Sequence, residues 1–451
     1  AGVGTLVLVA AVARRYFGAG AGVVAAVLAL LYAPLLFYEL VLLRATLLAM
    51  VTAALVLAWQ EAIERDRPGV WLMVGFVTGA AILLKSVFLS FAVVGAVYAA
   101  VVGLRRNGGS PPAGGTGRAA GAVSAAGTVA AGVLLGMLPL IARNVAVGAP
   151  PLALAAPGLA NLIFGLGPGV NPLPGASTYD FASYGEILGR TDGGLFAAGV
   201  ELLRMHGGPG PFLTMLAKKF ITVWHWYEIP NNLNFHYFET RIGILQVLPL
   251  RFIVLAPLAL VGMGLGWRAS VRRWPLSLAV LTAVAVLTVF ANNSRTRLPL
   301  VVALIPFAAY AITRMAGWVR TRQWWRAAAA VAVAAGLSLA MSGELPGSGE
   351  RVRASDHALA LQAYYLPEAA AAEAAGEPER AAELFREAVR QGPAWVRDPA
   401  GLSAPTSQER ALAGLYVGIQ SRCAVLLEGA GRSAEAATHR DLARRLQAAL
   451  R

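Results

Sequence analysis

Residues 292–316 read NNSRTRLPLVVALIPFAAYAITRMA, and this stretch decides the fold class. From Leu298 to Ala316 its only charged residue is Arg314. A bilayer core about 30 Å thick is crossed by a helix of roughly 20 apolar residues. Open strand edges and irregular loops cannot satisfy their backbone groups in lipid, so a crossing segment must be helical. The stretch therefore predicts a transmembrane helix that begins beside two arginines.

Comparable apolar stretches fill most of the chain. Of its 451 residues, 57% are hydrophobic and only 14% are charged, and the mean hydropathy is +0.61. These values exclude a disordered chain, a basic nucleic-acid-binding domain and a simple soluble enzyme. We predict about ten spanning helices and hence an all-α, polytopic membrane protein. The predicted spans are residues 2–13, 19–38, 40–59, 69–84, 86–104, 119–142, 249–267, 274–291, 298–316 and 325–341.

Charge divides the chain into two unlike parts. Residues 1–341 hold 25 Lys and Arg against 10 Asp and Glu, whereas residues 342–451 hold 13 against 14. We predict a transmembrane domain over 1–341, with a long outer loop at 143–248, and a small soluble α-helical domain over 342–451. The single Cys423 excludes an internal disulfide. The chain starts at Ala1 inside an apolar stretch, which we interpret as an N-terminal truncation.

Arginines gather in every second connection between the predicted spans. Lys and Arg are enriched on the cytoplasmic side of the plasma membrane, so loop 143–248 and the C-terminal domain fall on the other side. This parity requires residues 212–228 not to cross. The Lys218–Lys219 pair and the aromatic run that follows suit an amphipathic helix at the membrane surface. The predicted cytoplasmic connections are residues 14–18, 60–68, 105–118, 268–273 and 317–324.

The C-terminal domain has the residue spacing of tetratricopeptide repeats. Small residues let two helices approach, an aromatic fills the gap, and proline ends the second helix. In the first copy these residues are Gly376, Ala381, Phe385, Ala388 and Pro393. A degenerate second copy has Ala424, Gly431, Ala436 and Ala443, with Arg440 in the aromatic position. Two interpretations stay open: a surface that binds a protein partner, and a four-helix appendage without a ligand.

Four cationic residues on the predicted outer face run against the trend of the other arginines: Lys85, Arg143, Arg295 and Arg297. Ionisable groups near the apolar layer are costly and often mark function. Because ammonium and guanidinium groups both bind phosphate, we predict that these four converge on the phosphate of a lipid donor. The alternative is that each side chain extends separately to the membrane surface.

The stretch WHWYEIPNN at 224–232 is a second candidate region. Pro230 ends the preceding helix, because it lacks an N–H and disfavours the helical region for Ile229. We predict that Glu228 orients a donor-binding cation and that Asn231 and Asn232 support the turn, since few acids lie on this face. The alternative is a helix-ending turn with a surface glutamate.

Two His-x-x-Glu pairs, His225 with Glu228 and His236 with Glu239, also occur in this region. On a helix this spacing puts both groups on one face, an arrangement that suits a divalent metal. We predict aromatic packing at these positions and no cofactor. A metal site at these pairs is the alternative.

Five segments together resemble a known family. In chain order they are ARRYFG (13–18), LLKS (83–86), PLIARN (139–144), WHWYEIPNN (224–232) and NNSRTRLPLVVALIP (292–306). They resemble the bacterial GT-C glycosyltransferases of glycosyltransferase family 39, also called dolichyl-phosphate-mannose-protein mannosyltransferase-like, and among them the members with a C-terminal tetratricopeptide tail. The resemblance implies transfer of a sugar from a polyprenyl-phosphate donor to an acceptor on the non-cytoplasmic face of the cell envelope. It implies an acidic general base in an outer loop upstream of Ala1, and it matches Lys85 to a position that is often Arg.

We therefore predict a lipid-linked-sugar glycosyltransferase. Its partners are the lipid-linked donor and the membrane lipids, with a protein partner on the repeats as an open possibility, and no nucleic acid. Two other functions stay open: a transporter or flippase for lipid-linked substrates, and a noncatalytic scaffold that presents the repeats. Transporters tend to carry inverted repeats and charges at the membrane midplane, and neither is evident among the predicted spans.

Overall fold

The computed structural model is predominantly helical over the residues that it describes. These are residues 1–41, 43–65, 67–106, 116–154, 157–167, 181–191, 194–230, 233–266, 274–290, 292–343, 357–358, 360–402 and 407–450. No strand occurs in these ranges, although an isolated parallel bridge joins Tyr32 to Leu250. The predicted class, an all-α polytopic membrane protein, is confirmed.

The chain forms two compact units. The first, called the membrane unit here, contains the residues before Pro168, Phe181–Tyr227 and Ile242–Gly343. The second, called the C-terminal unit, combines Glu228–Arg241 with the tail that follows Gly343. A segment from the middle of the chain therefore folds with its end.

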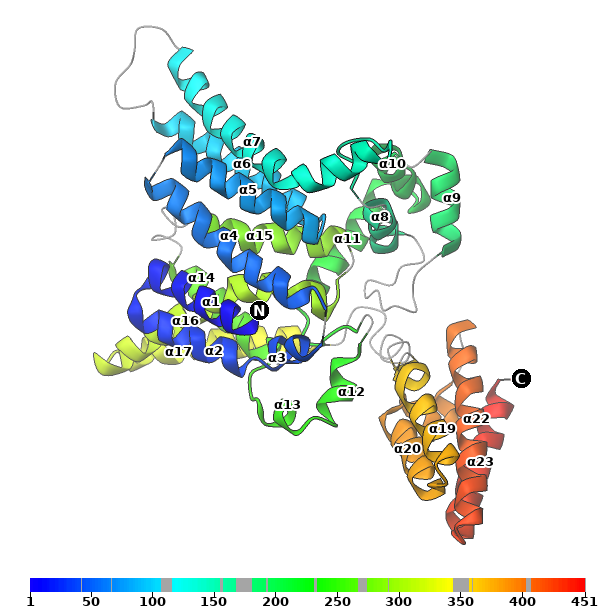
Figure 1. The fold of residues 1–451 in the computed structure, drawn as a ribbon. Coiled ribbons are helices and arrows are strands. Elements are labelled where there is room, and N and C mark those ends of the chain that lie inside the picture. The colour runs from blue at the N-terminus through cyan, green and yellow to red at the C-terminus, as the bar shows by residue number, and fades with distance from the viewer. Residues whose placement is uncertain are drawn as a thin grey trace. The chain divides into compact units, whose positions relative to one another are not determined.

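The predicted spans correspond to helices of the membrane unit (Figure 1). Five helices or parts of helices in the described chain are long and apolar enough to cross a membrane: α4, residues 124–146 of α7, α16, α17, and Glu409–Gly429 in the C-terminal unit. Five shorter apolar helices lie at α2, α5, Phe88–Val101 of α6, α14 and α15. The bounds are α1 Gly2–Phe17, α2 Ala19–Leu31, α3 Ala33–Leu40, α4 Ala45–Arg65, α5 Pro68–Leu84, α6 Phe88–Arg106, α7 Thr116–Ala146, α14 Phe252–Gly266, α15 Trp274–Val289, α16 Ser294–Arg320 and α17 Trp324–Ser342.

The helix boundaries differ from the prediction where proline or charge interrupts an apolar run. The span predicted at 19–38 is divided at Tyr32, whose backbone is extended. Pro34 lacks the N–H that would continue α2, and the N–H of Ala33 instead donates to the carbonyl of Leu250. The span predicted at 40–59 begins only at Ala45, so Arg44 lies before the helix rather than within it.

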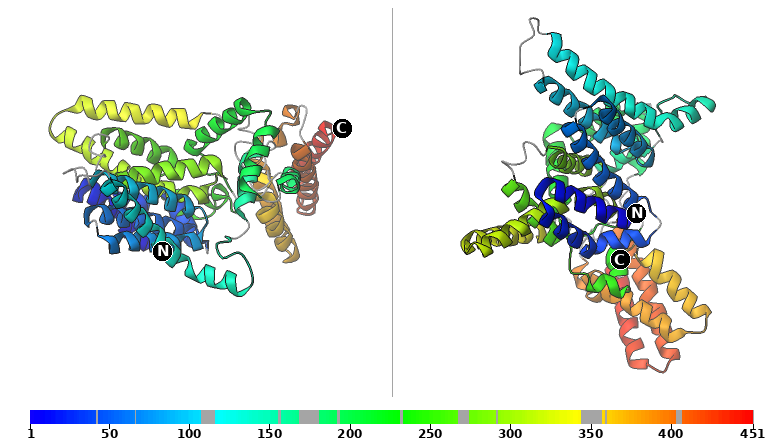
Figure 2. Two further views of the ribbon diagram at one scale, coloured as in Figure 1. Left: turned by 90° about the horizontal axis from the view of Figure 1, so that it is seen from above. Right: turned by 60° about the vertical axis from the view of Figure 1, so that its left-hand side comes forward.

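The backbones of helices α5 and α7 lie very close together. Figures 1 and 2 show α5, α6 and α7 side by side, and α7 packs against both of the others. A Cβ added to Gly75 or Gly79 would lie 2.2 Å from the carbonyl oxygen of Val129 or Val133. A Cβ on Gly132 or Gly136 would lie 2.2 or 2.3 Å from a carbonyl of α5. Small residues four apart thus face each other on both helices, an arrangement that favours close helix association in lipid.

The segment predicted to form the outer loop contains a group of amphipathic helices, which we call the outer helices after that prediction. They pack around a small core that includes Ile163, Ile187 and Leu202. Their bounds are α8 Pro157–Leu166, α9 Phe181–Thr191, α10 Leu195–Met205 and α11 Pro209–Trp224, and the short α13 Gly243–Val247 precedes α14. Among them α11 packs against the spanning helix α15.

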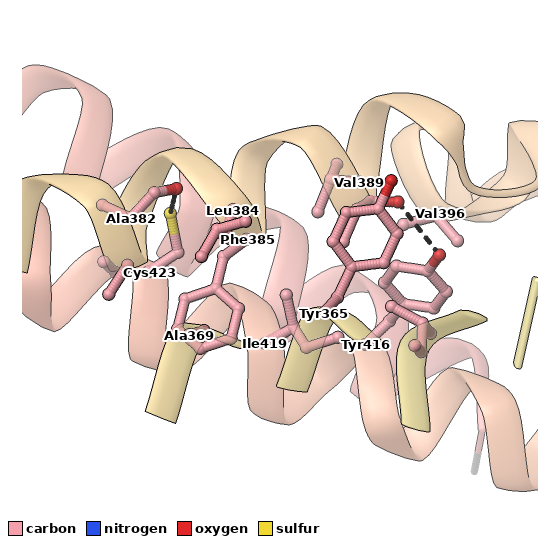
Figure 3. Packing of buried hydrophobic residues seen from close by; sticks show 14 of the residues in the cluster. Tyr365, Ala369, Ala382, Leu384, Phe385, Val389, Val396, Tyr416, Ile419 and Cys423 are labelled. Atoms are coloured by element: carbon pink, nitrogen blue, oxygen red, sulfur yellow. Dashed lines mark hydrogen bonds between the residues drawn. The ribbon is translucent and has the colours of Figure 1, made fainter. Parts of the chain in front are cut away.

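The C-terminal unit contains two helical hairpins. α19 pairs with α20, and α22 pairs with α23. Each turn holds a glycine with φ +75°, Gly376 and Gly431, a conformation that glycine adopts without strain. Figure 3 shows Tyr365 beside Tyr416, Phe385 beside Ala369, and the Cys423 thiol directed at the carbonyl of Ala382. The bounds are α12 Phe235–Glu239, η3 Leu361–Tyr365, α19 Leu366–Ala374, α20 Pro378–Gln391, α21 Ala394–Arg397, η4 Pro399–Gly401, α22 Ser407–Gly429 and α23 Ser433–Ala449.

Candidate functional site

Three cations from separate parts of the chain lie near one another in the membrane unit. Lys85 follows the last residue of α5, Arg44 precedes α4, and Arg295 lies in the first turn of α16. An Nη1 atom of Arg44 donates to the carbonyl of Leu84, 3.1 Å away, which holds it beside Lys85. Burial, followed by repulsion from Arg295 and Arg44, lowers the pKa of Lys85 to about 8. We call these three residues the basic cluster.

The geometry of the basic cluster suits an anion. Like charges disfavour one another's charged form, and an opposite charge within about 4–6 Å reverses that effect. Arg44 was not among the predicted site residues, because the span predicted at 40–59 enclosed it. The sequence feature that could have identified Arg44 is a cation inside an otherwise apolar run.

Arg297 has a different environment from Arg295. Its side chain is completely buried and lies over the ring of Phe252, 4.4 Å from the centroid. Its two terminal nitrogens donate to the carbonyls of His225 and Tyr227, at 3.0 and 2.8 Å. Arg297 therefore fixes the aromatic turn after α11 to the first turn of α16. Its predicted contact with a donor stays a prediction.

Arg143 lies exposed near the end of α7. It donates to the side-chain oxygen of Asn144 at 3.1 Å. The amide of Asn144 in turn donates to the carbonyls of Pro151 and Ala153, which organises the turn that follows α7. A role for Arg143 in donor binding stays a prediction.

Lys219 is buried, unlike the surface residue expected from the Lys218–Lys219 pair. Its ammonium donates to the carbonyls of Gly165, Val289 and Phe290, at 2.5, 3.3 and 2.9 Å. The last two carbonyls belong to the end of α15 and the residue after it, where backbone acceptors lack partners within the helix. Lys219 therefore joins the outer helices α8 and α11 to α15, whereas Lys218 is exposed.

Of the three site residues predicted in WHWYEIPNN, the structure describes Glu228. Glu228 is 2% exposed, so it is not the surface glutamate of the alternative interpretation. Asn231 and Asn232 lie outside the described residues. Whether Glu228 orients a cation stays a prediction.

The His-x-x-Glu pairs do not form a metal cluster in the described chain. One ring nitrogen of His225 is 3.1 Å from the carbonyl of Gly343, and the other accepts from the N–H of Tyr227 at 3.2 Å. His236 lies 3.5 Å from Glu239. Over the described ranges, no three His, Cys, Asp or Glu side chains are grouped so that they could hold a metal ion.

A cavity of about 510 Å³ lies on the outer helices, lined by Arg190, Glu201, Arg204 and Met205. Arg190 donates to Glu201 at 2.6 Å and lowers the pKa of that carboxyl. Both arginines are paired with Glu201, and Arg190 also with Glu186, so carboxylates already offset the positive charge in this cavity.

Similarity to known proteins covers the N-terminal part of the chain. Residues 1–111 match the family model of dolichyl-phosphate-mannose-protein mannosyltransferases. This match supports a membrane glycosyltransferase of the GT-C type. It includes Arg44 and Lys85 of the basic cluster, whereas Arg295 and the WHWYEIPNN stretch lie beyond it. No curated protein and no solved structure matches the chain.

Proposed function

We propose that this protein transfers a sugar from a polyprenyl-phosphate donor to an acceptor on the non-cytoplasmic face of the plasma membrane, and that the basic cluster binds the donor phosphate. The closeness of Arg44, Lys85 and Arg295 carries this proposal. The similarity of residues 1–111 to mannosyltransferases favours sugar transfer over simple lipid binding. The helical membrane unit provides the apolar surroundings that a polyprenyl chain requires.

The chemistry of the cluster follows from the bond that breaks. When the bond between the sugar's anomeric carbon and the phosphate oxygen breaks, the electron pair stays on the phosphate, which gains negative charge. Cations that meet this charge stabilise the transition state more than the bound donor. An arginine fork can bind two phosphate oxygens at once, and the lysine supplies a compact third charge.

The proposal is tested by sugar transfer with the full-length protein in lipid nanodiscs. The substrate is a radiolabelled polyprenyl-phosphate sugar, and the variants are Arg44→Gln and Lys85→Gln. Each substitution should lower kcat/KM for the donor by roughly 10- to 100-fold, the loss expected for one charge-assisted hydrogen bond. Lys218→Gln is the matched control, because that lysine is exposed on α11 and is outside the cluster. Equal activity of Lys85→Gln and Lys218→Gln would contradict the assignment of the cluster.

The same preparation also distinguishes sugar transfer from the two alternative functions. Movement of the labelled lipid across a vesicle membrane without sugar transfer would favour a flippase. Neither movement nor transfer, with donor binding also absent, would favour a noncatalytic scaffold.

A further inference from the structure

An outer-loop segment is built into the core of the C-terminal unit. Tyr237, from α12, is 2% exposed among buried residues of the tail. Its ring stacks on that of Tyr364, with centroids 4.4 Å apart and an interplanar angle of 14°. Its hydroxyl donates to Glu368 at 2.7 Å. One aromatic side chain of the loop thus fills a place that the tail alone would leave open.

Arg241, at the end of the same segment, contacts both aromatic rings and carboxylates. Its guanidinium lies over the rings of Tyr237 and Tyr365, at 4.3 and 5.2 Å from their centroids. It pairs with Glu387 at 3.3 Å and with Glu368 at 3.8 Å. Two carboxylates and an aromatic face from the tail surround one guanidinium, which combines ion pairing with cation–π attraction in a partly buried place.

The docked segment is short and locally ordered. The side chain of Asn234 accepts from the N–H of Tyr237 at 3.2 Å and caps α12. Along the sequence the segment begins seven residues after Tyr227, whose carbonyl Arg297 holds in the membrane unit. Ile242, the residue after Arg241, belongs to the membrane unit again. The tail therefore holds a segment that is tethered to the membrane unit at both ends.

We propose that the C-terminal unit is an intramolecular clamp whose partner is the chain's own segment Asn234–Arg241, with Arg241 as the positioning residue. The surface formed by Tyr364, Tyr365, Glu368 and Glu387 takes this segment rather than a separate protein. Because loop and tail fold together, they lie on the same side of the membrane. Resting on the proposed function, the clamp sets the position of the loop that carries WHWYEIPNN during sugar transfer.

Hydrogen exchange of the full-length protein in nanodiscs tests the clamp. Arg241→Met keeps much of the apolar stem and removes the charge and the fork. It should speed exchange of the amides at 234–241 by about tenfold or more, the loss of one charge-assisted hydrogen bond. Arg241→Lys should restore part of the protection, because it keeps the charge but not the planar fork. Arg380→Met is the matched control, since that arginine is exposed and its ion pair, with Glu377, lies within its own turn. Unchanged protection in Arg241→Met would overturn the clamp.

Exchange at α22 and α23 in the same experiment reports whether the unit itself stays folded. If Arg241→Met unfolds it, Tyr237→Phe, which removes only the hydrogen bond to Glu368, should loosen 234–241 selectively. Protection of that segment as in the wild type would then contradict the proposal.

Sugar transfer by the same variants tests the positioning role. Arg241→Met should lower kcat with the donor KM unchanged, and Arg241→Lys should recover part of kcat. Faster exchange at 234–241 with an unchanged kcat would contradict the positioning role of Arg241, whereas the clamp itself would stand. A wild type without transfer would refute the proposed function, while the exchange result would still decide the clamp.

Discussion

Lys85 lies where its charge depends on what binds beside it. It occupies the connection between α5 and α6, outside both helices, and burial with repulsion from Arg295 and Arg44 lowers its pKa to about 8. A bound phosphate would raise that pKa, because it favours the charged form. Binding and protonation of Lys85 are therefore linked.

We expect the donor affinity of the wild type to depend on pH above about 8. Below that pH Lys85 is already protonated and binding costs no proton uptake. Above it the free site loses its proton, so affinity should fall by up to about tenfold per pH unit until the pKa of the occupied site is reached. The measurement is donor KM from pH 6.5 to 10. Lys85→Arg should remove the dependence, and an equal slope in both proteins would contradict this assignment.

Arg297 is expected to act on stability rather than on the donor. A lysine at this position cannot reach both carbonyls and also cover the ring of Phe252. Arg297→Lys should lower the free energy of unfolding by about 1–3 kcal/mol, the cost of one buried group without its partner. The measurement is the thermal unfolding midpoint in detergent, with donor KM determined below it. A raised KM at an unchanged midpoint would instead place Arg297 in the donor site.

At this scale the sequence showed which residues were unusual but not what they contact. Lys85 and Arg295 were identified from charge against an apolar background. The carbonyl partners of Arg297 and Lys219 were not predictable, because they are backbone atoms of segments 54 to 72 residues away. The burial of Tyr237 was not predictable either. Its ring stacks on that of Tyr364, and these two residues meet only when the C-terminal unit folds.

Among the elements, the crossing of α5 and α7 tolerates little change. Each of its four glycines faces a backbone carbonyl, and a carbonyl in a helix cannot turn away as a flexible side chain does. The helices are therefore held at a separation that any added Cβ would increase.

Gly79→Val or Gly136→Val should destabilise the protein by about 1–3 kcal/mol or more, the cost of overpacking a well-packed interface. Gly127→Ala, in the same helix α7, is the control, because a Cβ there meets nothing within 4 Å. The comparison is made by thermal unfolding in one detergent. Equal midpoints for Gly79→Val, Gly136→Val and Gly127→Ala would show that the helices do not meet at these glycines.

The apolar runs were enough to predict most helices, because composition alone distinguishes a lipid-compatible segment. Boundaries failed where a local feature outweighed composition: Pro34 divides one run, and Arg44 delays the start of α4. The repeated Gly-x-x-x-Gly spacing in α5 and α7 is visible in the sequence, but which pair of helices it joins is a tertiary fact.

For the whole molecule, orientation in the membrane stays a prediction from the arginine distribution. It is testable with single cysteines, because Cys423 is the only native cysteine and is buried. In intact cells an impermeant maleimide should label Lys218→Cys, on the outer helices, and should miss Thr321→Cys, after α16. Labelling of both, or of Thr321→Cys alone, would reverse or abolish the assigned orientation.

The clamp of Asn234–Arg241 by the tail also dictates an order of events during biosynthesis. Tyr237 emerges from the ribosome 131 residues before Glu368, its hydrogen-bond partner. At 5–20 residues per second, the loop waits about 7 to 26 s for the surface that will hold it. During that interval α14 to α17 are synthesised and inserted, while the aromatic side chains of α12 have no tail to cover them. A nascent chain that stalls before residue 357 would thus leave exposed Tyr237 and Phe238, the two aromatic side chains that pack against the tail in the folded chain.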